Sequence, residues 1–331
     1  MMISWVTHHG RSAGIAHALG IEPIFLPERL AGQSLIRRYV ASGIFTYRAL
    51  SRSYDGVIVL MLPPAPLLVL VRILRPRTEI IADLHTGFFS DPKWRWSTKL
   101  CMKLLRGSLA IVTNRPLQER CRSNGISAII LHDLLRNAND CPEKPSTVGQ
   151  NPAPTVVCPL SYANDEPVAG LLQAARLSPD VNFFLTGRPP NSIRDQAPSN
   201  VTFTGYLSNR DYDQLLNRSD VVMALTTREL TMQRAGYEAF MAGKPQVTSD
   251  FTTLKDFYED CAVYVEPAEA GSIAAGVREA LQRTDELSKR AHRVADARLD
   301  EQAKQLEWLG NYVRAPRHVK RTMRLELKEG G

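Results

Sequence analysis

Cysteine is scarce in this 331-residue sequence: there are five, widely spaced and without a CxxC pair. This pattern excludes a disulfide framework and argues against a structural zinc site, and it is typical of reduced thiols in the cytosol. A basic segment followed by an apolar one is missing at the N-terminus, so no secretory signal peptide is expected.

Long uninterrupted hydrophobic runs are also missing. The most apolar stretch, residues 57–74, contains three prolines and Arg72. A membrane-spanning helix needs about 20 apolar residues and tolerates such interruptions poorly. We therefore expect a buried parallel strand, a turn and a helix in this stretch.

Acidic residues are few in the N-terminal half, where residues 1–140 hold 18 Lys and Arg against 9 Asp and Glu. Residues 141–313 are acidic overall, with 17 basic and 23 acidic residues, and residues 314–331 form a basic tail. Such asymmetry indicates a partner rather than a fold. The basic half is suited to nucleic acid, anionic lipid or a phosphorylated substrate, but no nucleic-acid motif accompanies it, so we expect no nucleic-acid partner.

One basic stretch, residues 93–106, combines positive charge with tryptophan. Helical spacing would place Arg95, Lys99 and Lys103 on one face, and a basic helix of this kind can lie in a membrane interface. An ordinary surface helix that packs on its own domain is the alternative. The residues expected to face a membrane are Trp94, Arg95, Trp96, Lys99 and Lys103.

Short apolar strands alternate with helices in two separate series, which predicts an α/β protein with two doubly wound, Rossmann-like domains. A segment rich in Pro, Asn and Gly separates the series. We expect an N-terminal domain over residues 1–136, a linker over 137–154, a C-terminal domain over 155–313 and a tail over 314–331. Two such domains are expected to face each other across a ligand cleft at the carboxyl ends of their strands.

The clearest chemistry in the C-terminal half lies in the loop over residues 226–231, which leads into a helix near Met232. A helix N-terminus offers free N–H groups and a favourable dipole to a diphosphate, and Arg228 and Arg234 would add positive charge. Glu238 lies one turn after Arg234, where its carboxylate could accept hydrogen bonds from the two hydroxyls of a ribose. A simple surface pair between Arg234 and Glu238 is the alternative.

Residues 200–267 resemble the nucleotide-sugar domain of GT-B glycosyltransferases, especially the retaining enzymes of the family-four type. The residues that carry the resemblance are Gly205, Leu215–Leu216, Ser219–Asp220, Glu238–Ala239 and Ala242–Pro245. The resemblance implies the GT-B architecture, a nucleotide-diphosphate sugar as co-substrate without a further cofactor or metal, and Glu238 as the residue that holds the ribose. A literal DxD match at residues 211–213 is interpreted as the first turn of a helix.

Two departures from the family pattern bear on the donor site. Leu230 stands where the family often has a second Glu, with Glu229 beside it, and both basic residues that usually follow the first strand of this domain are missing from residues 159–167. Phosphate charge is then expected on other basic residues. The complete set of expected donor-binding residues is Gly187, Arg188, Arg228, Glu229, Thr231, Arg234 and Glu238.

The N-terminal half carries candidate groups for the acceptor. Asp83 and His85 follow an apolar strand, where a doubly wound sheet places its chemistry, and either could orient or deprotonate a hydroxyl. The alternative is a cap or turn role for both. His9, Gly10 and Arg11 form the first strand–helix turn and are expected at the acceptor side of the cleft.

These features predict a cytoplasmic glycosyltransferase that moves a sugar from a nucleotide-diphosphate sugar to a hydroxyl, with a lipid-linked glycan of bacterial polysaccharide biosynthesis as acceptor. The basic half and its tryptophans would place the enzyme at the inner face of the plasma membrane. Two alternatives remain open: an isomerase like the nucleotide-sugar 2-epimerases, and a protein that binds sugar nucleotides without catalysis.

Overall fold

The computed structural model describes residues 1–30, 34–51, 56–135 and 153–329. The chain divides into two compact units, one made of residues 1–134 with 301–331 and the other of residues 135–300. Each unit is built around one six-stranded parallel sheet, which confirms the predicted α/β class with two doubly wound domains. The predicted linker lies almost entirely outside the described residues.

The sheet of the first unit has the strand order β2-β1-β3-β4-β5-β6. Its central strands are short apolar runs that are buried along their whole length, as a parallel sheet covered on both faces requires. The stretch that imitates a membrane span forms β3, a turn and a helix, as expected. The strands are β1 (Met2–Ser4), β2 (Pro23–Phe25), β3 (Ile58–Leu62), β4 (Ile80–Leu84), β5 (Leu109–Val112) and β6 (Ser127–Ile130).

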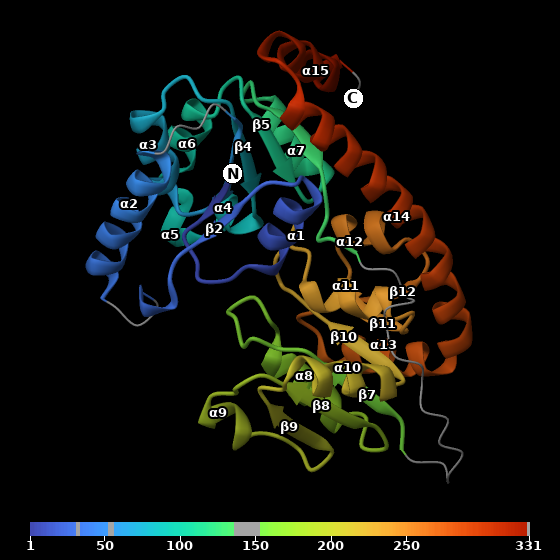
Figure 1. The fold of residues 1–331 in the computed structure, drawn as a ribbon. Coiled ribbons are helices and arrows are strands. Elements are labelled where there is room, and N and C mark those ends of the chain that lie inside the picture. Colours follow the sequence, from blue (N-terminus) through green and yellow to red (C-terminus); the bar gives the residue numbers. More distant parts are fainter. Residues whose placement is uncertain (31–33, 52–55, 136–152, 330–331) are drawn as a thin grey trace. The chain divides into compact units, whose positions relative to one another are not determined.

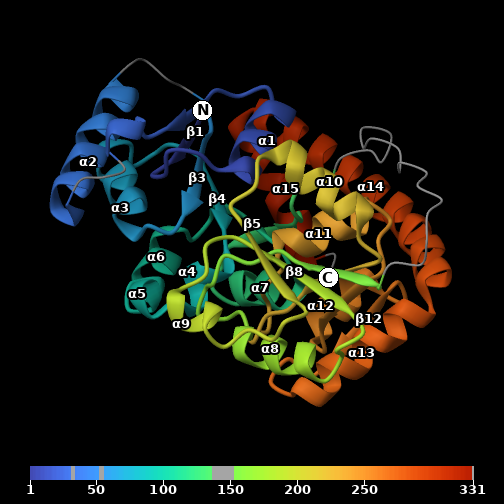
Figure 2. The same ribbon diagram turned by 90° about the horizontal axis from the view of Figure 1, so that it is seen from below.

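Helices cover both faces of this sheet. The helix α1 packs on one face together with the C-terminal helices α14 and α15, while α2, α3 and α6 pack side by side elsewhere in the unit (Figures 1 and 2). The helices of residues 1–134 are α1 (Gly10–Ala18), α2 (Leu35–Ser51), α3 (Ala65–Leu74), α4 (Thr86–Ser90), α5 (Pro92–Arg95), α6 (Thr98–Leu104) and α7 (Arg115–Arg122), with a 3-10 turn at Glu28–Leu30.

The basic stretch over residues 93–106 is not one helix, so that prediction is wrong. The helix α5 ends at Arg95, and α6 begins at Thr98. The Ser97 hydroxyl donates to the Trp94 carbonyl at 2.7 Å, which closes the turn between them. Trp94 is half-buried with its ring 6.4 Å from that of Tyr39, whereas Trp96 is largely exposed.

The sheet of the second unit has the order β12-β11-β10-β7-β8-β9. The helices α8 and α13 pack on one face of its apolar core. The strands are β7 (Thr155–Cys158), β8 (Asn182–Thr186), β9 (Val201–Gly205), β10 (Val221–Ala224), β11 (Gln246–Ser249) and β12 (Ala262–Val265). The helices are α8 (Val168–Arg176), α9 (Asn191–Arg194), α10 (Asn209–Arg218), α11 (Arg234–Met241), α12 (Thr252–Tyr258) and α13 (Ala270–Gln282).

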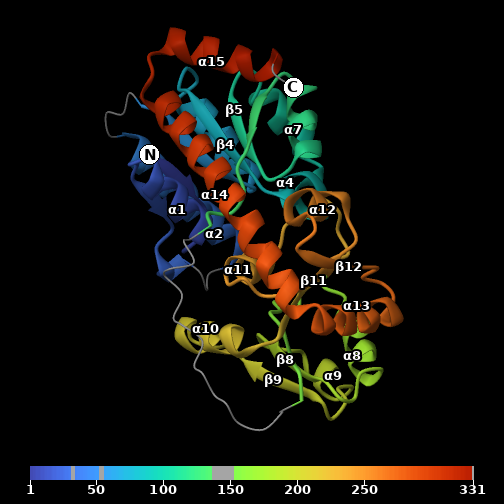
Figure 3. The same cartoon turned by 90° about the vertical axis from the view of Figure 1, so that its right-hand side faces the viewer.

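The C-terminal helices return to the first unit. The helix α14 (Thr284–Arg314) begins in the second unit and ends in the first, and α15 (Arg317–Glu329) lies against β6 (Figure 3). Leu309 and Tyr312 are fully buried in the core of the first unit, and Arg324 pairs with Glu79. The sequence-based domain boundary at residue 313 therefore differs from the division at residue 300, because the second half of α14 supplies apolar side chains to the first sheet.

No helix among the described residues is long and apolar enough to cross a membrane. Four cysteines are described, and all are buried and free. Burial raises the pKa of the Cys101 thiol to about 11 and that of Cys121 to about 12, so these thiols stay protonated at neutral pH.

Truncating a C-terminal core residue should loosen the first unit and spare the second. We expect Leu309→Ala to destabilise the first unit by about 3 kcal/mol, because the change leaves a cavity under its sheet. Hydrogen exchange followed by mass spectrometry should then show faster exchange in β5 and unchanged exchange in β10. Equal acceleration in both strands would contradict the division at residue 300.

Candidate functional site

Five polar side chains gather at the carboxyl ends of the strands in the first unit. His9 and Arg11 come from the start of α1, Asp83 and His85 from the end of β4, and Asp133 from the loop after β6. Ion pairs, a hydrogen bond and a contact between two histidine rings join them into one cluster. The first strand–helix turn and the end of β4 were both singled out from sequence, and the fold brings them together.

An ion pair forms the centre of this cluster. Arg11 Nη2 lies 3.0 Å from Asp83 Oδ1, and Arg11 Nε donates to the same carboxylate at 3.2 Å. The guanidinium also reaches Asp133 at 3.2 Å and the Leu131 carbonyl at 2.8 Å. Both members of the central pair are buried, Asp83 being only 1% exposed. Burial alone would raise the pKa of Asp83, but the charges and hydrogen bonds of Arg11 and His85 together outweigh burial and hold this pKa well below its usual range.

Asp83 also fixes the imidazole of His85. His85 Nε2 lies 3.2 Å from Asp83 Oδ2, and an ionised carboxylate can only accept, so Nε2 is the nitrogen that carries the proton. In the neutral ring Nδ1 is then the basic nitrogen. His85 is partly exposed whereas Asp83 is not. The imidazole can therefore meet a hydroxyl, and the carboxylate acts through it.

His9, whose ring lies next to that of His85, has a structural role. Its Nδ1 accepts a hydrogen bond from the Ser12 backbone amide and caps α1. Burial and the neighbouring His85, whose ring centre lies 5.0 Å away, lower the pKa of His9 to about 4. His9 is therefore uncharged at neutral pH.

Two of the predicted acceptor-side residues have a structural role in this arrangement. The side chain of Arg11 is almost fully buried and serves as the partner of Asp83, so its contacts are made within the protein, and its place at the acceptor side of a cleft stays a prediction. Gly10 is the first residue of α1. The sequence does not reveal the ion pair, because its two members are 72 positions apart.

The second unit holds a separate cluster around Glu238 on α11. Glu238 Oε2 accepts a hydrogen bond from Tyr212 Oη at 2.7 Å, and Oε1 lies 2.7 Å from Arg234 Nε. Burial and the carboxylate of Glu238 raise the pKa of the Tyr212 phenol well above its usual range, so it remains a donor. Tyr212 comes from the DxD match, whose position in the first turn of α10 agrees with its interpretation as a helix start. Its contact with Glu238 was not expected.

The loop before α11 is tied to the loop after β7. Asp165 Oδ2 accepts from the Thr226 hydroxyl at 3.0 Å, and the Asp165 carbonyl accepts from the Thr227 amide at 2.7 Å. Arg228 contacts both Asn164 and Asp165, the latter at 3.7 Å. Part of the positive charge expected for a diphosphate at Arg228 is thus already paired. The helix α11 begins at Arg234 rather than near Met232, and its N-cap residue, Gln233, makes no side-chain cap hydrogen bond.

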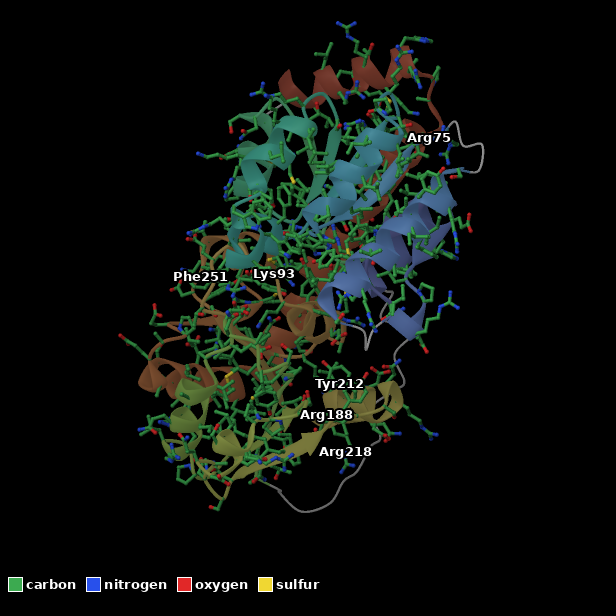
Figure 4. All side chains as sticks on the ribbon, turned by 90° about the vertical axis from the view of Figure 1, so that its left-hand side faces the viewer. Arg75, Lys93, Arg188, Tyr212, Arg218 and Phe251 are labelled. Atoms are coloured by element: carbon green, nitrogen blue, oxygen red, sulfur yellow. The ribbon has the colours of Figure 1, made fainter. Side chains whose placement is uncertain are left out.

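Gly187 and Arg188 follow β8 at the same edge of the sheet. Gly187 has a φ of +82°, and a Cβ placed there would lie 2.2 Å from the Leu160 carbonyl oxygen, so only glycine fits. Arg188 is exposed and joins no ion pair within the described residues (Figure 4). Glu229 and Thr231 lie in the loop before α11, near Leu230, whose φ is +67°.

Glu166 shapes this edge of the sheet, and Lys244 has a structural role at the opposite edge, where β10 and β11 begin. The Glu166 carboxylate accepts from the Ser161 amide at 3.1 Å and the Ala163 amide at 2.9 Å, so an acid rather than a base closes the loop after β7. Lys244 of the Gly-Lys-Pro sequence is buried and donates to the Ser219 carbonyl at 2.8 Å, beyond the end of α10. That lysine is a structural residue.

Residues 154–283 match the family model "Glycosyl transferases group 1", which covers most of the second unit. The match confirms the predicted resemblance in this part of the chain and the predicted enzyme class of transferase. No protein among the curated sequences matches this one.

Solved structures resemble the whole chain at low sequence identity. A crystal structure of Anabaena HepE in complex with UDP and glucose aligns with a TM-score of 0.68 at 18% identity, covering 91% of this chain and 90% of that one. Sucrose-phosphate synthase from Thermosynechococcus elongatus aligns with a TM-score of 0.74 at 13% identity, covering 93% and 97%. A glycosyltransferase from Rickettsia africae gives 0.65 at 10% identity, covering 94% and 89%. The predicted GT-B fold is confirmed.

The ion pair of Arg11 and Asp83 should be essential to the stability of the first unit. We expect Asp83→Asn to lower its free energy of unfolding by about 3 kcal/mol, because the change strands a buried guanidinium. All four tryptophans lie in residues 1–134 and 301–331, so tryptophan fluorescence during urea unfolding reports this unit alone.

The matched control replaces both partners at once, as Arg11→Met with Asp83→Leu. It should cost less than the single change, because no fully buried charge is left unpaired: Asp133, the other partner of Arg11, is partly exposed. A double variant that is at least as unstable as Asp83→Asn would show that the pair is not what the site depends on.

A second prediction concerns pH. Because the pKa of folded His9 is about 4, the unfolded chain takes up a proton first as the pH falls below about 6.5. The first unit should therefore lose stability between about pH 6.5 and pH 4. In His9→Asn, which keeps a capping side chain, this loss should be smaller. Urea midpoints at pH 7.5, 6 and 5 test it, and identical pH dependence in both proteins would refute it.

Proposed function

We propose that this transferase moves a sugar from a nucleoside-diphosphate sugar to a hydroxyl group of a lipid-linked glycan. The observation that carries the donor half is Glu238, a half-buried carboxylate on α11 inside the matched glycosyl transferase segment. Support comes also from HepE, whose crystal structures hold UDP and UDP-glucose. A uridine diphosphate sugar is therefore the first donor to test.

Glu238 is proposed to hold the ribose. Its two oxygens are aligned by Tyr212 and Arg234, and each retains a further lone pair for a ribose hydroxyl. The diphosphate would meet the uncapped N-terminus of α11, with Arg188 and Arg234 as its cationic partners. We propose that these groups, together with the remaining charge of Arg228, neutralise the diphosphate without a bound cation. Gly187 would allow backbone to approach the donor closely, and Glu229 and Thr231 would contact the sugar end.

His85 is proposed as the group that receives the acceptor proton. As the acceptor oxygen bonds to the anomeric carbon, its proton passes to His85 Nδ1, and the bond between that carbon and the diphosphate oxygen breaks. The nucleoside diphosphate leaves with the electron pair of that bond. Asp83 is a positioning residue in this scheme, because its buried carboxylate holds Nε2 of the ring and stabilises the imidazolium. His9 would border the acceptor as a neutral group.

The acceptor is proposed to be presented at the anionic inner face of the plasma membrane, in line with the excess of basic residues over residues 1–140. A lipid-linked glycan of polysaccharide biosynthesis fits that charge through its phosphate groups. The residues first considered for membrane contact, Trp94, Arg95, Trp96, Lys99 and Lys103, belong to this proposal.

A thermal-shift series tests the donor. UDP and UDP-glucose at about a hundred times their dissociation constant should stabilise the protein by about 2.7 kcal/mol, and GDP, ADP and dTDP should stabilise it less. Glu238→Gln should weaken UDP binding at least about tenfold, because it removes charge-assisted hydrogen bonds to the ribose. Asp213→Asn on the neighbouring helix is the matched control and should bind as the wild type does.

Other outcomes would point to other functions. Stabilisation by no nucleotide would contradict the donor proposal and favour a protein that has lost catalysis. Conversion of the UDP-sugar into its 2-epimer in the absence of any acceptor, without net release of UDP, would favour the epimerase alternative.

A further inference from the structure

The helix α2 presents an apolar stripe to solvent. Ile36, Val40, Ile44 and Tyr47 lie on one face, and each is between 49% and 78% exposed. With about 3.6 residues per turn, these positions form a continuous row. Exposed apolar side chains usually occur singly on a soluble protein, whereas a contiguous set marks an interaction surface.

The stripe is separate from the face that α2 uses for its own unit. Ser42, Thr46 and Leu50 are the buried residues among positions 36–51 of the helix, and the Thr46 hydroxyl accepts from Trp5 Nε1 at 2.8 Å. These three positions lie roughly 100° away from the centre of the stripe around the helix. The row of exposed residues is therefore an additional surface.

Neighbouring helices extend the same kind of surface. The helix α3 packs against α2 and against α6, and the three helices, coloured blue to teal, lie side by side toward the viewer in Figure 4. Ile73 of α3 is 71% exposed, Trp96 is 76% exposed, and Leu100 of α6 is half-exposed. Together these residues form what we call the α2 surface: Ile36, Val40, Ile44, Tyr47, Ile73, Trp96 and Leu100.

The charged side chains of the helices that carry the α2 surface are all basic, and one acidic residue, Asp91, caps α5. The helices α2, α3, α5 and α6 contain no aspartate or glutamate at all. Exposed basic residues flank the apolar ones, and they include Arg37, Arg48, Lys93, Arg95, Lys99 and Lys103. A second copy of this chain would bring the same cations against each other, whereas an anionic bilayer offers both an apolar layer and a layer of phosphates.

We propose that the α2 surface is the part of this protein that lies in the interface of an anionic phospholipid bilayer, its apolar side chains among the acyl chains and its cations on the lipid phosphates. The inference deepens the proposed use of a lipid-linked acceptor and rests on it. It places the principal membrane contact on α2, a helix for which sequence analysis predicts no such contact, and it includes Trp96 in that contact, with Lys99 beside it.

Co-sedimentation of the full chain with vesicles tests this surface. Wild type should pellet with vesicles of phosphatidylcholine and phosphatidylglycerol at low salt, and much less with phosphatidylcholine alone. The variant Ile36→Gln, Val40→Gln and Ile44→Gln keeps good helix formers on an exposed face, and it should lose more than tenfold in partitioning. Leu177→Gln, at a half-exposed leucine of the second unit, is the matched control and should partition as the wild type does.

Single substitutions of basic residues test the electrostatic component of membrane binding separately from the apolar component. Each of Arg37→Gln, Lys99→Gln and Lys103→Gln should weaken partitioning about fivefold at low salt, which corresponds to about 1 kcal/mol per basic residue near an anionic surface. The apolar triple variant should retain UDP binding in the thermal-shift assay, so that a failed membrane contact and a failed donor site are told apart.

Three results would overturn the inference. The first is wild type that stays in the supernatant with anionic vesicles at low salt, and the second is an apolar triple variant that pellets as the wild type does. A wild-type dimer in light scattering that becomes a monomer in the triple variant would assign the α2 surface to a second copy instead of a bilayer.

Discussion

The buried ion pair between Arg11 and Asp83 is the interaction on which the chemistry of the first unit depends. It links the first turn of α1 to the end of β4, and it keeps Asp83 ionised although the carboxylate is out of water. Ionised Asp83 in turn decides which nitrogen of His85 carries the proton. A single buried pair thus fixes the orientation and the tautomer of the partly exposed imidazole, whereas an isolated histidine on a loop would have neither fixed.

The corresponding edge of the sheet in the second unit carries both acidic and basic side chains. Carboxylates occupy the loop after β7, where Glu166 binds backbone amides and Asp165 binds Thr226. The basic side chains of this edge are Arg188 before α9, Arg228 before α11 and Arg234 at the start of α11. Arg228 is partly neutralised by Asp165 and Arg234 is paired with Glu238, whereas Arg188 joins no ion pair within the described residues.

The sequence predicted the strands well and the polar contacts poorly. Runs such as Ile58–Leu62 and Val221–Ala224 can be recognised as strands in the sequence, because a parallel strand buried on both faces must be apolar throughout. The fold class and the position of Glu238 followed from local pattern and resemblance. The pairing of Arg11 with Asp83 and of Tyr212 with Glu238 depends on residues that are distant along the chain, and local spacing carries no information about it. The short break between α5 and α6 depends on a single hydroxyl, that of Ser97.

The path of α14 has a consequence for the order in which this protein is made. Residues 135–300 are contiguous, so the second unit can close its core as soon as they have left the ribosome. The first unit begins the chain, yet it needs Leu309 and Tyr312 for its core and Arg324 as the partner of Glu79. The core of the first unit therefore stays incomplete until nearly the whole polypeptide has been synthesised. The half that is translated first is the half that finishes folding last, contrary to the usual order of domains during synthesis.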